Sequence, residues 1–121
     1  MRDNYFEVPL MNKFFLLFIA FFILNTSFLE AAVYKGQKIF VKKCVTCHEA
    51  GQAFIAKKKI RQWKKIMLQN GKPLADLHLA SSKAENSWDY FQSKKYYRDS
   101  KHLKQFLIEY AKDSGNVPAC N

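Results

Sequence analysis

The pentapeptide Cys44-Val45-Thr46-Cys47-His48 constrains this chain more than any other feature of its sequence. It places two thiols three positions apart, with an imidazole directly after the second thiol. In a C-x-x-C-H motif the thiols can add across the two vinyl groups of a haem, while the adjacent histidine reaches the iron. The motif therefore predicts one covalent haem c held by Cys44 and Cys47, with His48 as the proximal iron ligand.

Two other kinds of site use closely spaced cysteines. A thioredoxin-like redox pair is one, and half of a structural zinc site is the other. The first would need a strand-helix-strand pattern around Cys44 and Cys47, and the sequence offers none. The second would need another close pair of Cys or His residues, which the sequence also lacks. Haem attachment is therefore the favoured interpretation.

The N-terminal segment has the three-part plan of a secretory signal peptide. Lys13 precedes an unbroken apolar run from Phe14 to Leu24, and the small residues Ala31-Ala32 follow. The run is short for a membrane span, so a cleaved signal over residues 1–32 is favoured over an uncleaved anchor helix. We therefore expect export to the periplasm and a soluble mature protein.

The first ten residues do not fit this plan, because Asp3 and Glu7 oppose the positive charge that a signal requires. Translation starting at Met11 would remove the conflict. Cleavage after Ala32 of the 121-residue chain leaves 89 residues, 33–121, as one domain. A chain of that size builds only a modest apolar core and benefits from a covalent or metallic centre.

The mature chain is strongly basic. Residues 1–32 contain two basic and three acidic side chains, so their removal raises the formal charge from +10 to +11. An exported protein meets no nucleic acid, so this charge favours acidic proteins as partners, and secondarily weak association with anionic lipid. The alternative is that scattered lysines serve solubility alone.

The residues before the motif resemble a known family. The stretch GQKIFVKKCVTCH, residues 36–48, is similar to the start of class I c-type cytochromes. In that family a glycine and an aromatic residue let the first helix cross the last at close range. The resemblance places Gly36 and Phe40 at those positions, with Tyr110 of the last helix against Phe40.

The C-terminal region has the pattern of an amphipathic helix. Ser100 is a candidate N-cap, and Gly115 and Pro118 are stop signals. The apolar residues between them recur at helical spacing: Leu103, Phe106, Leu107, Tyr110 and Ala111. This segment is the expected last helix.

A middle helix is expected within residues 57–71. Ile60, Trp63, Ile66 and Met67 fall on one face, and Asn70-Gly71 ends the segment. Class I cytochromes often carry a tryptophan that donates a hydrogen bond to a haem propionate, a role that the resemblance assigns to Trp63. A plain core tryptophan is the alternative.

A second aromatic cluster lies in residues 86–97. Trp88, Phe91 and Tyr96 are expected to cover the haem edge, with Ser87 capping a short helix. A large flat cofactor needs such apolar walls, which exclude water. We therefore expect an all-α, cytochrome c-like fold of about four helices around one haem.

The sixth iron ligand departs from the family pattern. Class I cytochromes usually supply a methionine between the middle and last helices, but residues 68–100 contain none. His78 is the favoured candidate, because it follows Pro73, which we expect to break the middle helix. Met67 and His102 are the alternatives, and an open site is a fourth.

These features predict an electron carrier rather than an enzyme. We expect a monomeric monohaem cytochrome that moves electrons between acidic redox proteins and requires no small-molecule substrate. The alternative is a haem protein with an open distal site that binds or reduces a small molecule such as nitric oxide or peroxide. A haem-free exported binding protein is a third hypothesis. Cys120 is expected to be an idle terminal thiol, with an intermolecular disulfide as the alternative.

Overall fold

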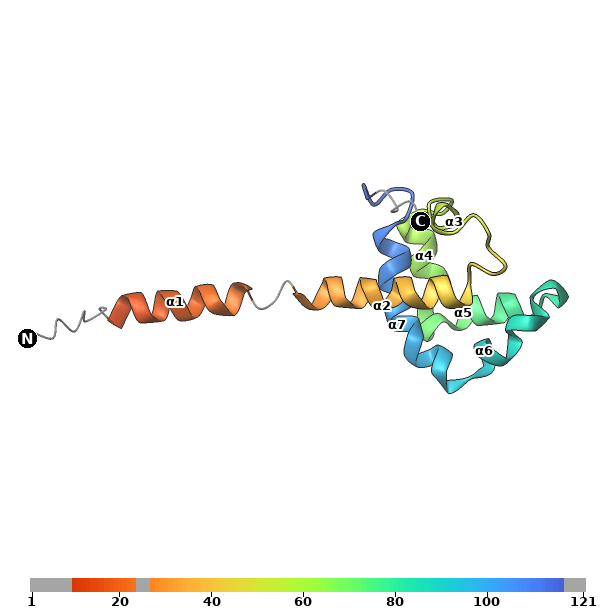
Figure 1. The fold of residues 1–121 in the computed structure, drawn as a ribbon, viewed down its shortest axis with the longest axis horizontal. Helices are drawn as coiled ribbons and strands as arrows, with labels where there is room; N and C mark the ends of the chain where they lie inside the picture. The colour runs from red at the N-terminus through yellow and green to blue at the C-terminus, as the bar shows by residue number, and fades with distance from the viewer. Residues whose placement is uncertain (1–9, 24–26, 117–121) are drawn as a thin grey trace, which may run out of the picture. The chain divides into compact units, whose positions relative to one another are not determined.

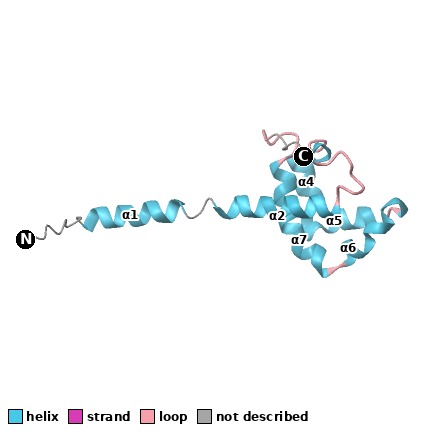
Figure 2. Cartoon of the chain, in the orientation of Figure 1, coloured by secondary structure: helices cyan, strands magenta, loops and turns pink. Residues whose placement is uncertain are grey.

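The computed structural model describes residues 10–23 and 27–116 of the chain. Within these ranges the regular secondary structure is entirely helical, and no strand occurs (Figure 2). The expectation of an all-α protein is confirmed. The chain divides into two units, residues 1–30 and residues 31–121. The second unit contains the cysteine motif.

The first unit contains α1 (Leu10–Ile23), which is rich in phenylalanine, leucine and isoleucine. The side chains from Phe14 to Ile19 are exposed. Among the described residues, no helix combines the length and the apolar character that crossing a membrane requires. The signal peptide over residues 1–32 stays a prediction, and part of it, together with Pro118 and Cys120, lies outside the described residues.

The second unit begins within α2 and continues through shorter and longer helices to α7 (Figure 1). The described residues of this unit thus contain more helices than the four or so expected, and three of the elements are short, at four to six residues. In chain order the elements are α2 (Ser27–Lys43), α3 (Gln52–Ile55), α4 (Ile60–Ile66), α5 (Leu68–Leu79), the 3-10 helix η1 (Ser82–Ser87), α6 (Trp88–Gln92) and α7 (Lys94–Glu109).

Helices α2 and α7 cross at Gly36, as expected from the sequence. A Cβ atom at Gly36 would collide with the backbone oxygen of His102 and with the Cβ of Phe106, so only glycine fits. One turn later the rings of Phe40 and Phe106 are in contact, with centroids 5.6 Å apart. Tyr110 packs on Phe106 at 5.2 Å. Phe106 therefore contacts both Phe40 and Tyr110, in place of the expected direct pairing of Tyr110 with Phe40.

Helix α7 begins earlier than the sequence suggested. Ser93 is its N-cap, and the Ser93 side chain accepts a hydrogen bond from the Tyr96 backbone N–H at 3.2 Å. Ser100, the expected cap, lies buried inside the helix, where its hydroxyl donates to the Tyr97 carbonyl at 2.8 Å. Both serines are adequate caps in isolation, but the burial of Tyr96 favours the longer helix.

The connection between α4 and α5 contains the sharpest turn of this unit. Helix α4 ends at Ile66, and Gln69, Asn70 and Gly71 all have positive φ angles, of 49°, 56° and 80°. The helix thus ends earlier than the expected Asn70-Gly71, and these two residues lie instead in the left-handed run that follows it. From the sequence we expected Pro73 to break the preceding helix. Pro73 lies instead in the first turn of the following helical segment, where its missing N–H costs little.

Two hydrophobic cores hold the second unit together. The large core joins α2, α3, α4 and α7, and the small core joins α5, α6 and α7. Burying each large apolar side chain contributes about 1.5–3 kcal/mol, so the large core supplies most of the stability. The large core consists of Phe40, Ile55, Trp63, Met67, Leu103, Phe106, Leu107 and Ala111, and the small core of Ala75, Phe91 and Tyr96.

Candidate functional site

The cysteine motif folds as one helical turn beyond the end of α2. The Cys44 carbonyl accepts hydrogen bonds from the backbone N–H groups of Cys47, at 3.2 Å, and of His48, at 2.8 Å. Residues three and four apart lie on the same face of a helical turn. This turn therefore brings Cys44, Cys47 and His48 to one side of the backbone, as covalent attachment of a flat cofactor next to an iron ligand requires.

His48 is positioned by the segment that follows it. Gly51 adopts a left-handed conformation with φ of 54°, and its N–H donates to the His48 carbonyl at 2.9 Å. This turn reverses the chain into α3, whose Phe54 stacks on the His48 ring at a centroid distance of 4.0 Å and an angle of 25°. The imidazole is thus held against an aromatic surface.

The motif's environment keeps two of its groups uncharged. Burial is the main cause that lowers the pKa of His48, and the nearby His78 and Lys57 lower it further. Burial raises the pKa of the Cys44 thiol to about 12, with a smaller contribution from Cys47. A neutral imidazole is the form that ligates a metal, so the lowered pKa of His48 favours a ligand role.

His78 lies in the last turn of α5 and is half-buried. Its Nδ1 lies 2.8 Å from the backbone oxygen of Leu74. Because a carbonyl oxygen only accepts, Nδ1 carries the proton in this contact, and the neutral ring then has its lone pair on Nε2. Metal-binding histidines commonly show this arrangement, in which one ring nitrogen donates to a backbone carbonyl and the other is left for the metal.

Two aromatic residues of α6 fix His78 further. The ring of Phe91 stacks on the His78 imidazole with centroids 4.1 Å apart and an angle of 24°. The indole N–H of Trp88 donates to the His78 backbone carbonyl at 2.9 Å. Both the ring and the backbone of His78 are thereby held, which limits the range of directions in which Nε2 can point.

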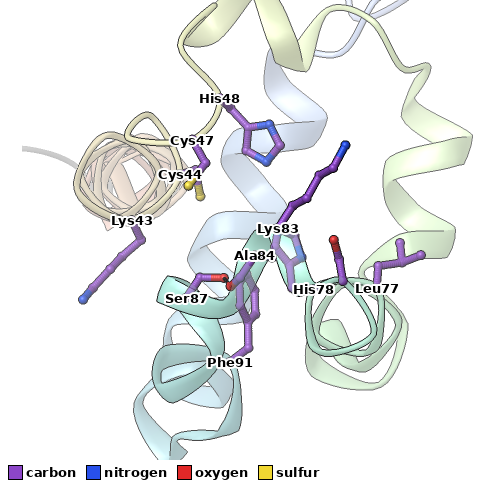
Figure 3. A pocket seen from close by; sticks show the side chains of 11 residues that line it. Lys43, Cys44, Cys47, His48, Leu77, His78, Lys83, Ala84, Ser87 and Phe91 are labelled. Atoms are coloured by element: carbon purple, nitrogen blue, oxygen red, sulfur yellow. Dashed lines mark hydrogen bonds between the residues drawn. The ribbon is translucent and has the colours of Figure 1, made fainter.

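His48 and His78 face a common cavity of about 340 Å³, within the size range of ligand pockets. Their ring centroids are 6.2 Å apart and their planes are nearly perpendicular, at 83°. Figure 3 shows the cysteines and His48 above the cavity in that view, and His78 and Phe91 below it. The lining residues are Lys43, Cys44, Cys47, His48, Leu77, His78, Ser81, Lys83, Ala84, Ser87 and Phe91.

The two tryptophans have other partners than those expected. The indole N–H of Trp63 donates to the Ile55 carbonyl at 2.9 Å, in a buried hydrogen bond. Trp63 lines a second, smaller cavity of about 30 Å³ beside Cys44 and His48. Trp88 does not line the 340 Å³ cavity and acts on it through His78. In this structure, therefore, backbone carbonyls occupy both indole donors.

The other aromatic expectations are met in part. Phe91 lines the cavity. Tyr96 does not line it, but its ring packs on the Phe91 ring with the two centroids 4.9 Å apart. Ser87 stands at the N-cap position of α6, but its side chain makes no capping bond. Its hydroxyl donates instead to the Ala84 carbonyl at 2.7 Å. The wall of the cavity is therefore formed by Phe91 alone among the aromatic residues of α6 and α7.

The remaining candidates for a distal ligand lie elsewhere. Met67 is buried in the large core, and His102 is half-buried on α7, where its backbone oxygen meets Gly36. Neither lines the cavity that His48 faces. Among the described residues, no three His, Cys, Asp or Glu side chains form a group that could hold a metal ion by themselves. His78 is the candidate that the fold brings opposite His48.

Sequence reasoning missed several residues of the site, among them three with large side chains. Phe54 stacks on His48, Leu77 lines the cavity with its side chain exposed, and Lys83 extends along the cavity mouth (Figure 3). An aromatic residue six positions after the motif histidine was a usable signal for Phe54. Leu77 and Lys83 carried no signal, because their position depends on how α5 and η1 meet.

Comparisons of this chain with family models, with curated proteins and with solved structures found no match. The resemblance to class I c-type cytochromes therefore rests on residues 36–48 and stays a prediction.

Proposed function

We propose that this chain is a small monohaem c-type cytochrome of the class I type, exported to the periplasm, and that it carries electrons between redox proteins. The observation that carries the proposal is the placement of His78 across one cavity from the C-x-x-C-H motif. Thirty residues separate His48 from His78, so no local rule of sequence brings them together.

The distance between the two imidazoles fits a shared iron. A bond between a metal and an imidazole nitrogen is about 2 Å, and the ring centroid lies roughly 1 Å farther from the metal. Two imidazoles on opposite sides of one iron therefore have centroids about 6 Å apart. The observed separation is 6.2 Å. The donor set, two thiols and two imidazoles around one cavity, also matches the needs of haem c.

Each residue of the site would have a distinct role. Cys44 and Cys47 would form the two thioether bonds, and His48 and His78 would bind the iron. When bound, the haem supplies an iron that exchanges one electron. The protein's own contribution is orientation: Phe54 and Phe91 hold the imidazoles, and the Leu74 carbonyl fixes the tautomer of His78.

Two histidine ligands would place the carrier at the reducing end of the range for c-type haems. Methionine paired with histidine raises the reduction potential, and this site offers no methionine, because Met67 lies in the large core. His48 and His78 together would leave the iron no ligand position for a substrate. Electron carriage without catalysis is therefore the economical function.

The surface supports a partner of opposite charge. Basic side chains cluster at Lys42-Lys43, Lys57 to Lys59, Lys64-Lys65 and Lys94-Lys95, and most of them are exposed. Lys43 and Lys83 lie at the cavity itself. Basic side chains around a site steer association with acidic proteins. Salt screens this electrostatic attraction beyond a Debye length of about 8 Å at physiological ionic strength. We therefore propose acidic redox proteins as partners of the monomeric carrier.

The decisive experiment is the absorbance spectrum of the protein exported from a host with haem-ligation machinery. We expect a low-spin ferric spectrum without the iron–methionine charge-transfer band, and haem stain that survives denaturing electrophoresis. His78→Ala should convert the haem to a high-spin, ligand-accessible form, whereas the matched variant His102→Ala should keep the wild-type spectrum.

Three results would count against the proposal in different ways. A colourless protein would remove haem altogether, and stain that persists after loss of both Cys44 and Cys47 would remove covalent attachment. A high-spin wild-type spectrum would favour an open site that binds a small molecule.

A further inference from the structure

The turn that leads into the His78 helix is strained. Gln69, Asn70 and Gly71 are consecutive left-handed residues, and two of them carry side chains that disfavour this conformation. Such a run persists only where surrounding contacts hold it in place. The direction of the helical segment from Lys72 to Leu79, and hence the position of His78, follows from this turn.

Tyr96 supplies the contact that holds the turn. Its hydroxyl donates to the Gly71 carbonyl at 2.6 Å, and the Tyr96 side chain is fully buried. There is no room for a Cβ at Gly71, because it would collide with the Tyr96 hydroxyl and press on the end of Met67. Burial also raises the pKa of Tyr96, so its hydroxyl stays protonated as a donor.

The same tyrosine also supports the His78 ring from the other side. The rings of Tyr96 and Phe91 are in contact at a centroid distance of 4.9 Å, and Phe91 stacks on His78 at 4.1 Å. Tyr96 thus contacts the turn in front of the helical segment, and also contacts the residue that packs on the imidazole at its end.

We propose that Tyr96 is a positioning residue for His78. The inference rests on the proposed function and goes beyond it: the Tyr96–Gly71 hydrogen bond latches the strained turn, and its release lets the 72–79 segment shift so that His78 leaves the iron. The latch therefore sets how readily an external ligand reaches the distal position.

The test uses cyanide binding to the ferric, haem-loaded protein. Cyanide must displace His78, so its apparent affinity scales with the fraction of protein in which His78 has left. Tyr96→Phe removes only the hydroxyl and keeps the ring. Loss of one buried hydrogen bond from the closed form should raise the apparent cyanide affinity about threefold to tenfold.

Tyr90→Phe is the matched control. The Tyr90 ring packs on Phe91 and Tyr96, with centroids 5.4 Å away in each case, so it belongs to the same aromatic cluster. Its hydroxyl, however, donates to Asp99 at 3.2 Å and makes no bond to the turn. We expect the cyanide affinity of this variant to stay within about twofold of wild type.

The outcomes separate the latch from its alternatives. Unchanged affinity in Tyr96→Phe, with a low-spin wild type, overturns the latch and leaves the proposed function intact. Equal increases in both variants also overturn it, because they indicate general loosening. A protein that binds no haem overturns the proposed function and the latch together.

A second measurement covers the case in which Tyr96→Phe does not fold. Cyanide bound to the wild-type protein should then increase hydrogen exchange at the backbone amides of residues 72–78, relative to the cyanide-free form. Exchange that stays unchanged in this segment overturns the latch without any variant.

Discussion

The two hydrophobic cores of the second unit support His48 and His78, on the two sides of the proposed site, in different ways. The large core contains eight buried residues and holds the side of His48, whereas the small core contains three and holds the side of His78. The large core relies on extensive apolar contact, including the close α2–α7 crossing at Gly36. The side of His78 relies on a few directed contacts, from Phe91 and Tyr96 of the small core and from Trp88 beside it.

This difference separates stability from ligand control. Removing one side chain from the large core should destabilise the whole domain. Removing one contact from the small core should change the position of His78 at a smaller cost in folding. The four predictions below test this division of labour, from the largest expected effect to the smallest.

The largest effect should come from truncating one phenylalanine in each core. Phe106 is completely buried in the large core, so Phe106→Ala should lower the free energy of unfolding of the haem-free domain by about 3–5 kcal/mol. Phe91 borders the cavity, so Phe91→Ala leaves less new void and should cost about 2–3 kcal/mol. Urea denaturation followed by circular dichroism measures both values.

A surface variant controls for general effects of truncation. Tyr97 is 44% exposed, and Tyr97→Ala should cost under about 1 kcal/mol. Equal losses for Phe106→Ala and Phe91→Ala would show that the two cores contribute alike, contrary to the comparison.

The two tryptophans offer a second, closely matched test. Each indole N–H donates to a backbone carbonyl at 2.9 Å, but Trp63 is buried in the large core and Trp88 is half-buried. Trp63→Phe removes a buried hydrogen bond and leaves a void in the large core, although the Ile55 carbonyl keeps the Lys58 N–H as a donor at 3.2 Å. Together these losses should cost about 1–3 kcal/mol. Trp88→Phe should cost about 1 kcal/mol or less, because water can replace the donor.

In the haem-loaded protein the larger effect, now on the spin state of the haem, should come from Trp88→Phe. Trp88→Phe should raise the fraction of high-spin haem, because the His78 backbone loses a restraint, whereas Trp63→Phe should leave the spin state unchanged. Absorbance spectra of the two variants measure this difference. Identical spectra would show that Trp88 has no influence on His78.

The third prediction concerns acid. Burial lowers the folded-state pKa of His48, and of His102, below the ordinary 6.5. The unfolded chain then binds more protons than the folded one, so this contribution to stability is fully present above pH 6.5 and is lost as the pH falls toward the folded pKa. The haem-free domain should therefore lose stability as the pH falls below about 6.5.

Urea denaturation at several pH values measures the slope. His48→Gln should remove part of it, and His102→Gln should remove another part. A slope that neither substitution reduces would place its origin in other groups.

The smallest effect involves no change in stability. Because burial raises the pKa of Cys44 to about 12, its thiolate fraction near pH 8 is on the order of one in ten thousand. Cys47 is exposed. In the haem-free domain iodoacetamide should therefore modify Cys47 first, and peptide mass spectrometry measures the order. In urea the two rates should converge, and equal rates in the folded domain would contradict the burial of Cys44.

The sequence predicted the features that depend on near neighbours along the chain. The spacing of Cys44, Cys47 and His48 places them on one face of any helical turn, whatever surrounds them. The apolar stripe from Leu103 to Ala111 predicted the buried face of α7 in the same way. The resemblance to class I c-type cytochromes implied a close crossing of the first and last helices at Gly36, and the structure shows this crossing.

The tertiary structure decided the features that depend on packing between distant segments. The sequence indicated Ser100 as the N-cap of the last helix, but the structure places the cap at Ser93 and buries Tyr96 in the first turn. His78 was favoured as the distal ligand over Met67 and His102, and the packing of distant helices brings it to the cavity that His48 faces. The sequence by itself therefore determined the all-α class, several of the helical segments and one face of the site. The second face required the fold, because a contact across thirty residues is fixed by how cores pack and not by local spacing.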